Sequence, residues 1–259
     1  MNAADRTFSI NENQFREMLE VVTKDFSALL LNAQCRRALA MARWTKSGKQ
    51  LRIFESPASG VMPGTVEHNR REIDANLFGS AERTQRLLGP LSAIDPVFGN
   101  AGKLTALSIG PRTEMELLHL IGIGFKVQNV RAVDLIASSP LMDLGDMHDL
   151  PYKDRSFHVV ISGWVLTYSK DPERAVREMV RVCADGGLLA IGVSSSPDYP
   201  GGYRAQPKDA KEIVGSMFRR ASDLAAMIGP SLDKICFQHD PIADDVTAPV
   251  LLIARIRHK

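Results

Sequence analysis

The sequence of 259 residues predicts an α/β fold, in which a mostly parallel sheet of seven strands has helices on both faces and a helical segment precedes it. Two observations support this prediction. From Lys103 onward, apolar runs alternate with helical patterns, which is typical of parallel strands joined by helices. The last two apolar runs are joined only by the connection PIADDVTA, which is too short for a helical crossover, so we expect these two strands to pair antiparallel.

The N-terminal part has a different texture. Between Asn13 and about Arg43, apolar residues recur at alternating spacings of four and three, which predicts one amphipathic helix with a stripe made of Phe15, Leu19, Val22, Phe26, Leu29 and Ala33. A loop rich in Pro, Gly and Ser follows at 56–65, and turn-rich residues at 89–102 close this part; between them we expect two short polar helices, at about 67–78 and 80–88.

This change of sequence pattern divides the chain after residue 102. We expect a helical extension over residues 1–102 and a single α/β domain over residues 103–259. The apolar stripe of the extension must be buried, either as a roof over the carboxyl ends of the strands or against a second copy of the chain in a homodimer.

The elements of the second part follow in order along the chain. We expect strands at 104–109, 127–135, 141–146, 157–162, 188–193, 234–240 and 249–257. A helix at 112–122 should open on the capping box formed by Thr113 and Glu116. Another should begin at Pro172 with Asp171 as its N-cap and end at Gly186 and Gly187. A long loop at 194–209 precedes a last helix, at about 210–228.

Composition and charge exclude several classes of protein. The net charge of +2 gives no electrostatic reason to expect nucleic acid or an anionic membrane as a partner. The three cysteines are widely separated and have no metal-ligand spacing, and the histidines form no such spacing either, so we expect no metal and a reducing, cytoplasmic compartment. The opening residues lack the features of a signal peptide, and no apolar run reaches the roughly 18 residues of a membrane span.

Two residues point to a ligand at the carboxyl ends of the strands, where open parallel sheets bind their ligands. Gly110 allows a tight turn after the first strand. Asp134 closes the second strand at an offset close to the roughly 20 residues at which an acid receives ribose hydroxyls in dinucleotide-binding folds. Either feature alone is more often structural.

The downstream motifs strengthen this interpretation. The run GDMHDLPYKDRSFHVVISGWVLTYSKDPERAVREMVRVCADGGLLAIGV at 145–193 resembles the class I S-adenosylmethionine-dependent methyltransferases of the small-molecule type. The resemblance covers about residues 103–193, and the closing antiparallel pair is also typical of that family. It implies a Rossmann-like fold, S-adenosylmethionine as cofactor and a small molecule as methyl acceptor.

The resemblance also implies roles for individual residues. The methionine part of the cofactor would lie against Gly110 and its neighbours Ser108, Pro111, Arg112 and Glu114. Asp134 and Leu135 would hold the ribose, and Asp146 would accept from the adenine amino group while the Met147 backbone N–H donates to the ring. Gly163 and Trp164 would line the place where the methyl group leaves.

The glycine motif of the family is altered here. Ser108 takes the place of the usual acid, and Pro111, Arg112 and Glu114 replace small residues. In one interpretation Arg112 binds the cofactor's carboxylate and Glu114 its ammonium group; in the other these two residues form a surface ion pair. For a hydroxyl acceptor, the candidate bases are His148 and Tyr168, although a positioning or packing role is favoured for each residue.

Three functions are therefore compared. The first is methyl transfer to a small molecule, such as a saccharide or a natural-product intermediate. The second is a methyltransferase-fold protein that has lost catalysis and serves as a binding or scaffold subunit, as the altered glycine motif suggests. A nicotinamide-dependent dehydrogenase is disfavoured, because the sequence lacks the glycine fingerprint and a Tyr-x-x-x-Lys pair.

Overall fold

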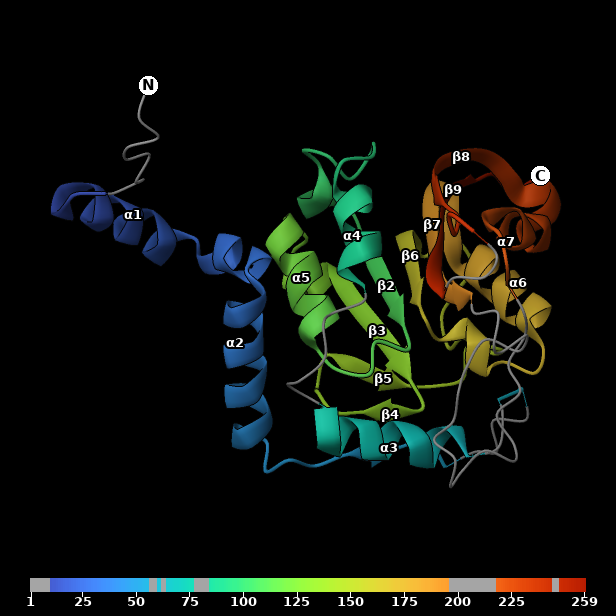
Figure 1. The fold of residues 1–259 in the computed structure, drawn as a ribbon, viewed down its shortest axis with the longest axis horizontal. Coiled ribbons are helices and arrows are strands. Elements are labelled where there is room, and N and C mark those ends of the chain that lie inside the picture. The colour runs from blue at the N-terminus through green and yellow to red at the C-terminus, as the bar shows by residue number, and fades with distance from the viewer. Residues whose placement is uncertain (1–9, 56–59, 62–63, 77–83, 196–217, 244–246) are drawn as a thin grey trace.

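The computed structural model describes residues 10–55, 60–61, 64–76, 84–195, 218–243 and 247–259. A sheet of seven strands forms its centre (Figure 1), and every strand expected from the sequence is present. The strands are β2 (Ala106–Ile109), β3 (Val130–Asp134), β5 (Met142–Leu144), β6 (Phe157–Gly163), β7 (Cys183–Ser195), β8 (Leu232–His239) and β9 (Ala248–Ile256).

The strand order is β5-β3-β2-β6-β7-β9-β8. The first five strands in this order are parallel, and β9 pairs antiparallel with both β7 and β8, as predicted. Because the chain moves outward from β2 to β3 and then returns to place β6 on the other side of β2, the order reverses between β2 and β6. Such a reversal is where open α/β sheets bind ligands, at the carboxyl ends of the strands.

Helices cover both faces of the sheet and bury a separate core on each (Figure 1). On one face, α4 (Gln85–Ser92) and α5 (Met115–Ile123) bury Leu87, Leu88, Leu91, Leu117 and Leu120. On the other, α6 (Pro172–Val182) and α7 (Ala221–Ile228) bury Val176, Met179, Leu224 and Ile228. The predicted cap of α6 is confirmed, since the Arg174 N–H donates to the Asp171 carboxylate at 2.9 Å.

The prediction of a single helix between Asn13 and Arg43 is wrong. The segment forms α1 (Glu12–Lys24), a 3-10 helix (Phe26–Leu31) and α2 (Ala33–Lys46). The breaks occur at Asp25 and Asn32, whose side chains accept backbone N–H groups of the next element and so act as N-caps. Gly122 lets the 3-10 helix pack closely on α5, because a Cβ at Gly122 would lie 2.8 Å from the Leu30 backbone.

The extension therefore meets the sheet in an unexpected way. Helix α1 buries none of its residues and extends away from the rest of the chain (Figure 1). Helix α3 (Thr65–Asn76) lies across one end of the sheet, below β4 (Ile136–Ala137) in Figure 1. A short strand, β1 (Arg52–Ile53), pairs antiparallel with β4, so the extension is not purely helical as expected.

Four smaller predictions also differ from the structure. Thr113 and Glu116 form no capping box: α5 begins at Met115, and the Glu116 carboxylate instead accepts from the Ser108 hydroxyl. Helix α4 continues through Pro90 into the segment expected to be turns. Burial of its three leucines outweighs the low helix propensity of Gly89 and Pro90. Helix α6 ends before Cys183, where β7 already begins. The last helix, expected at about 210–228, is α7 over Ala221–Ile228; residues 218–220 are not helical, and residues 210–217 lie outside the described residues, as do residues 196–209 of the expected loop.

None of the described helices is both long and apolar enough to cross a membrane. Within the described ranges, no group of three or more His, Cys, Asp or Glu side chains is arranged to hold a metal ion.

Candidate functional site

A pocket lies at the carboxyl ends of β2, β3, β5 and β6, on the edge where the strand order reverses. Its enclosed volume is about 30 Å³, well below the roughly 300–1,000 Å³ typical of ligand sites. Three residues of the N-terminal extension close it from outside the sheet. The lining consists of Val61, Thr65, Asn69, Ile109, Gly110, Val133, Asp134, Leu135, Gly145, Met147, Val165 and Tyr168.

The turn after β2 forms one wall of this pocket. Gly110 has a φ of +66°, and a Cβ on it would lie 2.4 Å from the Val165 side chain, so both conformation and space require glycine. Arg112 also has a positive φ, of 54°. This conformation directs the Arg112 N–H to the Asp134 carboxylate at 3.2 Å, while its guanidinium donates to the Asn69 side chain at 3.4 Å. The turn thus links the acid at the end of β3 to helix α3.

Asp134 is the acid of the pocket, and it is half-buried. One carboxylate oxygen accepts the Arg112 N–H and the other accepts the Ile136 N–H, each at 3.2 Å. Burial raises the pKa of Asp134 to about 6, although these backbone donors favour the charged form. Further donors, such as the hydroxyls of a diol, would stabilise the carboxylate in this place.

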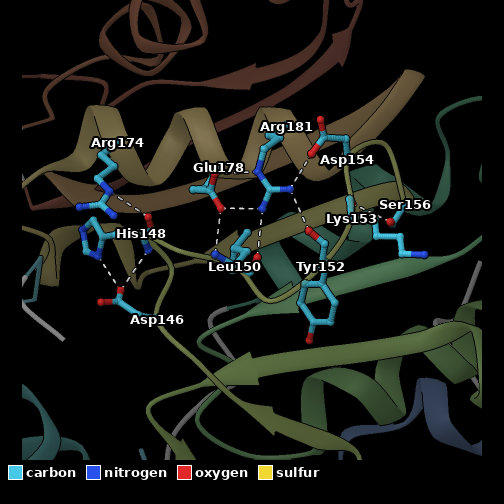
Figure 2. Close-up of polar contacts among 10 residues, drawn as sticks. All are labelled: Asp146, His148, Leu150, Tyr152, Lys153, Asp154, Ser156, Arg174, Glu178 and Arg181. Carbon is cyan, nitrogen blue, oxygen red and sulfur yellow. Dashed lines mark hydrogen bonds and ion pairs between the residues drawn. The ribbon is translucent and has the colours of Figure 1, made fainter. Parts of the chain in front are cut away.

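The loop after β5 contains a chain of three hydrogen-bonded side chains. The Asp146 carboxylate accepts from the His148 backbone N–H at 3.0 Å and from the His148 ring Nδ1 at 2.6 Å, as Figure 2 shows. The other ring nitrogen, Nε2, lies 2.6 Å from the Ser169 hydroxyl. Burial raises the cost of ionising Asp146, but the hydrogen bonds from His148 outweigh it and lower the pKa of the carboxyl. Asp146 is therefore held as a carboxylate.

Helix α6 holds this loop by its backbone. Arg181 donates to the carbonyl oxygens of Leu150 and Tyr152 at 3.0 and 2.8 Å, and forms a two-pronged ion pair with Glu178 at 2.7 Å (Figure 2). Glu178 in turn accepts the Leu150 N–H at 2.8 Å. The Arg181 guanidinium lowers the pKa of Glu178, despite the opposing effect of burial. Glu178 and Arg181, one turn of α6, thus bind three backbone groups of the loop.

The residues after β6 lie beside the pocket. Trp164 has a φ of +60°, and its indole N–H donates to the Ser194 hydroxyl at 2.8 Å, which turns the ring toward β7. Gly163 lies close to Thr84, the N-cap residue of α4. A Cβ on Gly163 would lie 2.5 Å from the Thr84 methyl group. Neither Gly163 nor Trp164 lines the pocket.

Comparison with known proteins agrees with this architecture. Residues 115–191 match the methyltransferase domain family. A segment of 64 residues is 38% identical to ajmaline N-methyltransferase of Rauvolfia serpentina, and one of 89 residues is 34% identical to demethylmenaquinone methyltransferase of Desulfitobacterium hafniense. The first match covers 25% of this chain and 22% of the relative, and the second 32% and 35%, so the chain spans about a third or less of the relatives it matches.

Solved structures show the same fold. A protein of Pyrococcus horikoshii superimposes with a TM-score of 0.53 and 12% identity, over 74% of this chain and 99% of that one. A chain of the Haloferax volcanii complex between the Trm112 methyltransferase activator and a methyltransferase gives a TM-score of 0.50 and 18% identity, over 74% and 94%. Residues 115–191 thus resemble a methyltransferase domain, and the solved structures share the fold. The seven-stranded sheet and closing antiparallel pair of this chain are those of the Rossmann-like methyltransferase fold.

The fold brings together some of the predicted site residues. Gly110, Asp134, Leu135, Met147 and Tyr168 line the pocket. Arg112 is joined to this set through Asp134, whereas Pro111 and Asp146 are adjacent in sequence to lining residues. This set of residues fits an adenosine: a half-buried carboxylate for a diol, a glycine turn at the strand end, and apolar walls for a planar ring.

Glu114 lies elsewhere. Its buried carboxylate forms an ion pair with Arg43 of α2 at 2.7 Å and accepts from the Ser139 hydroxyl. It lines a second cavity, of about 280 Å³, between α2 and the residues after β4. This placement does not support Glu114 as the partner of the cofactor's ammonium group, nor does the structure pair it with Arg112.

His148 is also not placed as a base. Its ring is buried, and both ring nitrogens have partners inside the protein. Ser108 is buried as well, and its hydroxyl donates a hydrogen bond to the Glu116 carboxylate of α5. Glu116 was missed because its spacing from Thr113 suggested a capping box.

The sequence interpretation also missed Val61, Thr65 and Asn69, which close the pocket from the extension. Helix α3 is polar and has no strong apolar stripe, so its pattern gave no signal that it packs over the strand ends.

Proposed function

We propose that this protein transfers a methyl group from S-adenosylmethionine to a small-molecule acceptor. The observation that carries this proposal is Asp134, a half-buried carboxylate at the carboxyl end of β3 that lines a pocket where the strand order reverses. The domain match and the methyltransferase relatives give independent support. Because those relatives are matched only in part, the activity of the whole chain remains the proposal.

The proposed cofactor residues follow the strand ends. Asp134 and Leu135 hold the ribose hydroxyls, and Asp146 with the Met147 N–H recognises adenine. Gly110, Pro111 and Arg112 meet the methionine part, with the Arg112 guanidinium binding its carboxylate. Gly163 and Trp164 flank the position of the departing methyl group. Ser108 supports this turn through its hydrogen bond to Glu116.

Methyl transfer requires few catalytic groups from the protein. When bound, the cofactor supplies a methyl group already activated by a sulfonium centre, so the chain's own residues bind, align and exclude water. Helix α3 is suited to exclude water, since Thr65 and Asn69 face the same pocket as Asp134. Tyr168, a buried residue of the pocket lining, is the remaining candidate for assisting a hydroxyl acceptor.

The acceptor is proposed as a small molecule, with a saccharide or a natural-product intermediate as examples. The relatives include an N-methyltransferase of ajmaline and a demethylmenaquinone methyltransferase, so the acceptor atom is left open. We propose residues 1–102 as a functional extension, in which α3 covers the cofactor and α1 contacts a second copy, and residues 103–259 as the catalytic domain. The cysteines within the described residues are all free, which favours a reducing cytoplasm.

The second candidate is a binding or scaffold protein that has lost catalysis. The narrow pocket and the bulky residues after Gly110 favour it. Calorimetric titration with S-adenosylmethionine, S-adenosylhomocysteine and NAD separates the candidates. Binding of the first two alone supports the proposal, no binding supports a scaffold, and binding of NAD alone supports a dehydrogenase.

The decisive variant is Asp134→Ala. Two charge-assisted hydrogen bonds to the ribose contribute about 1.5 to 3 kcal/mol each, so S-adenosylhomocysteine affinity should fall by about tenfold or more. The variant should keep its circular dichroism spectrum. An unchanged affinity removes Asp134 from the cofactor site.

The role proposed for Arg112 has its own test. Arg112→Ala should weaken S-adenosylhomocysteine much more than 5′-methylthioadenosine, which lacks the carboxylate, as measured by calorimetry. Glu114→Gln is the matched control, because Glu114 belongs to the same turn but pairs with Arg43. Equal losses for both ligands in Arg112→Ala would show a structural role.

A further inference from the structure

The two oxygens of the Asp146 carboxylate have different surroundings. Oδ1 accepts both hydrogen bonds from His148, one from the backbone and one from the ring. Oδ2 receives no hydrogen bond from any residue within the described ranges, and 12% of the Asp146 side chain is exposed. The carboxylate is therefore fixed on one side and available to a donor on the other.

The partners of the His148 ring determine which nitrogen holds the proton. Because Asp146 is a carboxylate, it can only accept, so Nδ1 carries the proton and donates it. In the neutral ring Nε2 then accepts from the Ser169 hydroxyl, whose oxygen also accepts the Asp171 N–H at 3.0 Å. Arg174 of α6 donates to the His148 carbonyl at 2.9 Å (Figure 2). Backbone and ring of His148 are thus both held.

The N-terminal extension packs directly on this ring. A Cβ on Gly60 would lie 2.6 Å from the His148 ring, so only glycine allows the present contact. The Gly60 carbonyl accepts the Lys170 N–H at 2.7 Å, and Val61 forms a β-bridge with Ser169. Gly60 and Val61 therefore close over the same chain of hydrogen bonds that ends at Asp146.

We propose that His148 is a positioning residue, which turns the free oxygen of Asp146 toward the adenine amino group, and that Gly60 holds the His148 ring in place from the extension. This inference rests on the proposed function, in which Asp146 recognises adenine. It replaces the sequence-based hypothesis that His148 is a base. It also gives the extension a second role: besides covering the pocket, it sets the selectivity of the adenine site.

The test compares two ligands that differ only at the amino group. S-Adenosylhomocysteine carries this donor, whereas its 6-deamino analogue carries a hydrogen atom in its place and keeps the ring nitrogens unchanged. Calorimetry should show that the unmodified protein prefers the adenosine ligand by about tenfold or more, the effect of one hydrogen bond to a charged group. A purely structural role for His148 would change the binding of both ligands by the same factor.

The variants separate the two ring nitrogens. His148→Leu should reduce the preference to within about threefold, whereas His148→Asn, whose amide can replace the Nδ1 donor, should retain most of it. Gly60→Ala should also lose preference, because its methyl group displaces the ring. Gly89→Ala is the matched control, since a Cβ there meets nothing within 4 Å.

The outcomes distinguish this inference from the proposed function. If the unmodified protein binds neither ligand, the proposed function fails and this inference fails with it. If the unmodified protein discriminates while folded His148→Leu and Gly60→Ala keep its full preference, only the inference is wrong. Thermal melts establish folding, and Ser169→Ala, which removes the Nε2 partner, gives the same readout if His148→Leu does not fold.

Discussion

Asp134 contributes to the proposed site, but its charged form lowers the stability of the fold. Burial makes its charged form unfavourable and raises its pKa to about 6, against about 3.9 in an unfolded chain. Two backbone N–H groups reduce this cost without removing it. A carboxylate in this state gains more from added hydroxyl donors than an exposed one, because they replace the water it has lost.

This leads to a prediction about pH. Between about pH 4 and pH 6 the folded protein retains a proton on Asp134 that the unfolded chain has lost, so raising the pH destabilises the fold. The free energy of unfolding, relative to Asp134→Asn, should decrease by up to about 3 kcal/mol between about pH 4 and pH 7. Urea unfolding of both proteins across this range measures the difference. Parallel pH profiles would show that Asp134 is not buried in solution.

At the scale of elements, α6 organises the loop that follows β5. Arg181 combines an ion pair with Glu178 and two hydrogen bonds to loop carbonyls. Arg177, one turn earlier, forms a long surface pair with Glu173 at 3.8 Å and no other ion pair with a residue that the structure describes. The same helix therefore contains a structural arginine and a matched surface control.

We expect Arg181→Ala to lower the free energy of unfolding by about 2 to 3 kcal/mol, because Glu178 and two carbonyl groups lose their donors. Arg177→Ala should change it by less than about 0.5 kcal/mol, as for other exposed pairs of this spacing. Chemical denaturation measures both. Similar values for the two variants would mean that the loop is not held by Arg181.

Helix α3 is the element that closes the pocket. Thr65 is buried and Asn69 accepts from the Arg112 guanidinium, so α3 is tied to the turn after β2. Because the enclosed volume is only about 30 Å³, a nucleoside must displace α3 or part of the lining on entry and be covered afterwards.

Hydrogen exchange should therefore show a gain of protection at residues 65–76 when S-adenosylhomocysteine binds, and none at residues 12–24, which lie outside the pocket. The measurement is repeated at two protein concentrations to separate ligand binding from association. Protection of residues 13–43 in place of residues 65–76 would support the hypothesis that the N-terminal helical segment forms the roof.

At the scale of the whole molecule, α1 is the exception to an otherwise compact arrangement (Figure 1). Phe15 and Leu19 of its apolar face are 51% and 47% exposed, although the face has the spacing of helices that pair with helices. Its charges have both signs, including the Glu12–Arg16 ion pair, which favours another protein surface over an anionic membrane. A second copy of the chain is the partner we propose.

Deletion of residues 1–24 should consequently leave the melting temperature within about 2 °C and S-adenosylhomocysteine affinity within about twofold, because α1 buries no residue. Light scattering should give a dimer for the full chain and a monomer for the shortened one. A full chain that stays monomeric would contradict the pairing of α1, and a loss of affinity would tie α1 to the site.

The sequence by itself determined the sheet. Its strands are short apolar runs and the helix after Asp171 has a local cap, and both signals act between near neighbours. Gly110 and Asp134 were predictable for the same reason, since each is fixed by its position at a strand end. Even the breaks at Asp25 and Asn32 had local signals, although the apolar stripe obscured them.

Only the tertiary structure decided how side chains distant in sequence are used. One interpretation of the sequence placed Glu114 on the ligand, and His148 was a candidate base. Arg43 lies 71 residues from Glu114 and Ser169 lies 21 residues from His148, and these partners occupy the two side chains. Helix α3 reaches the pocket because Thr65 and Asn69 pack over strand ends, which no periodicity in its polar sequence indicates. Local patterns encode secondary structure and strand ends, whereas partners brought together by packing decide which buried polar group remains available to a ligand.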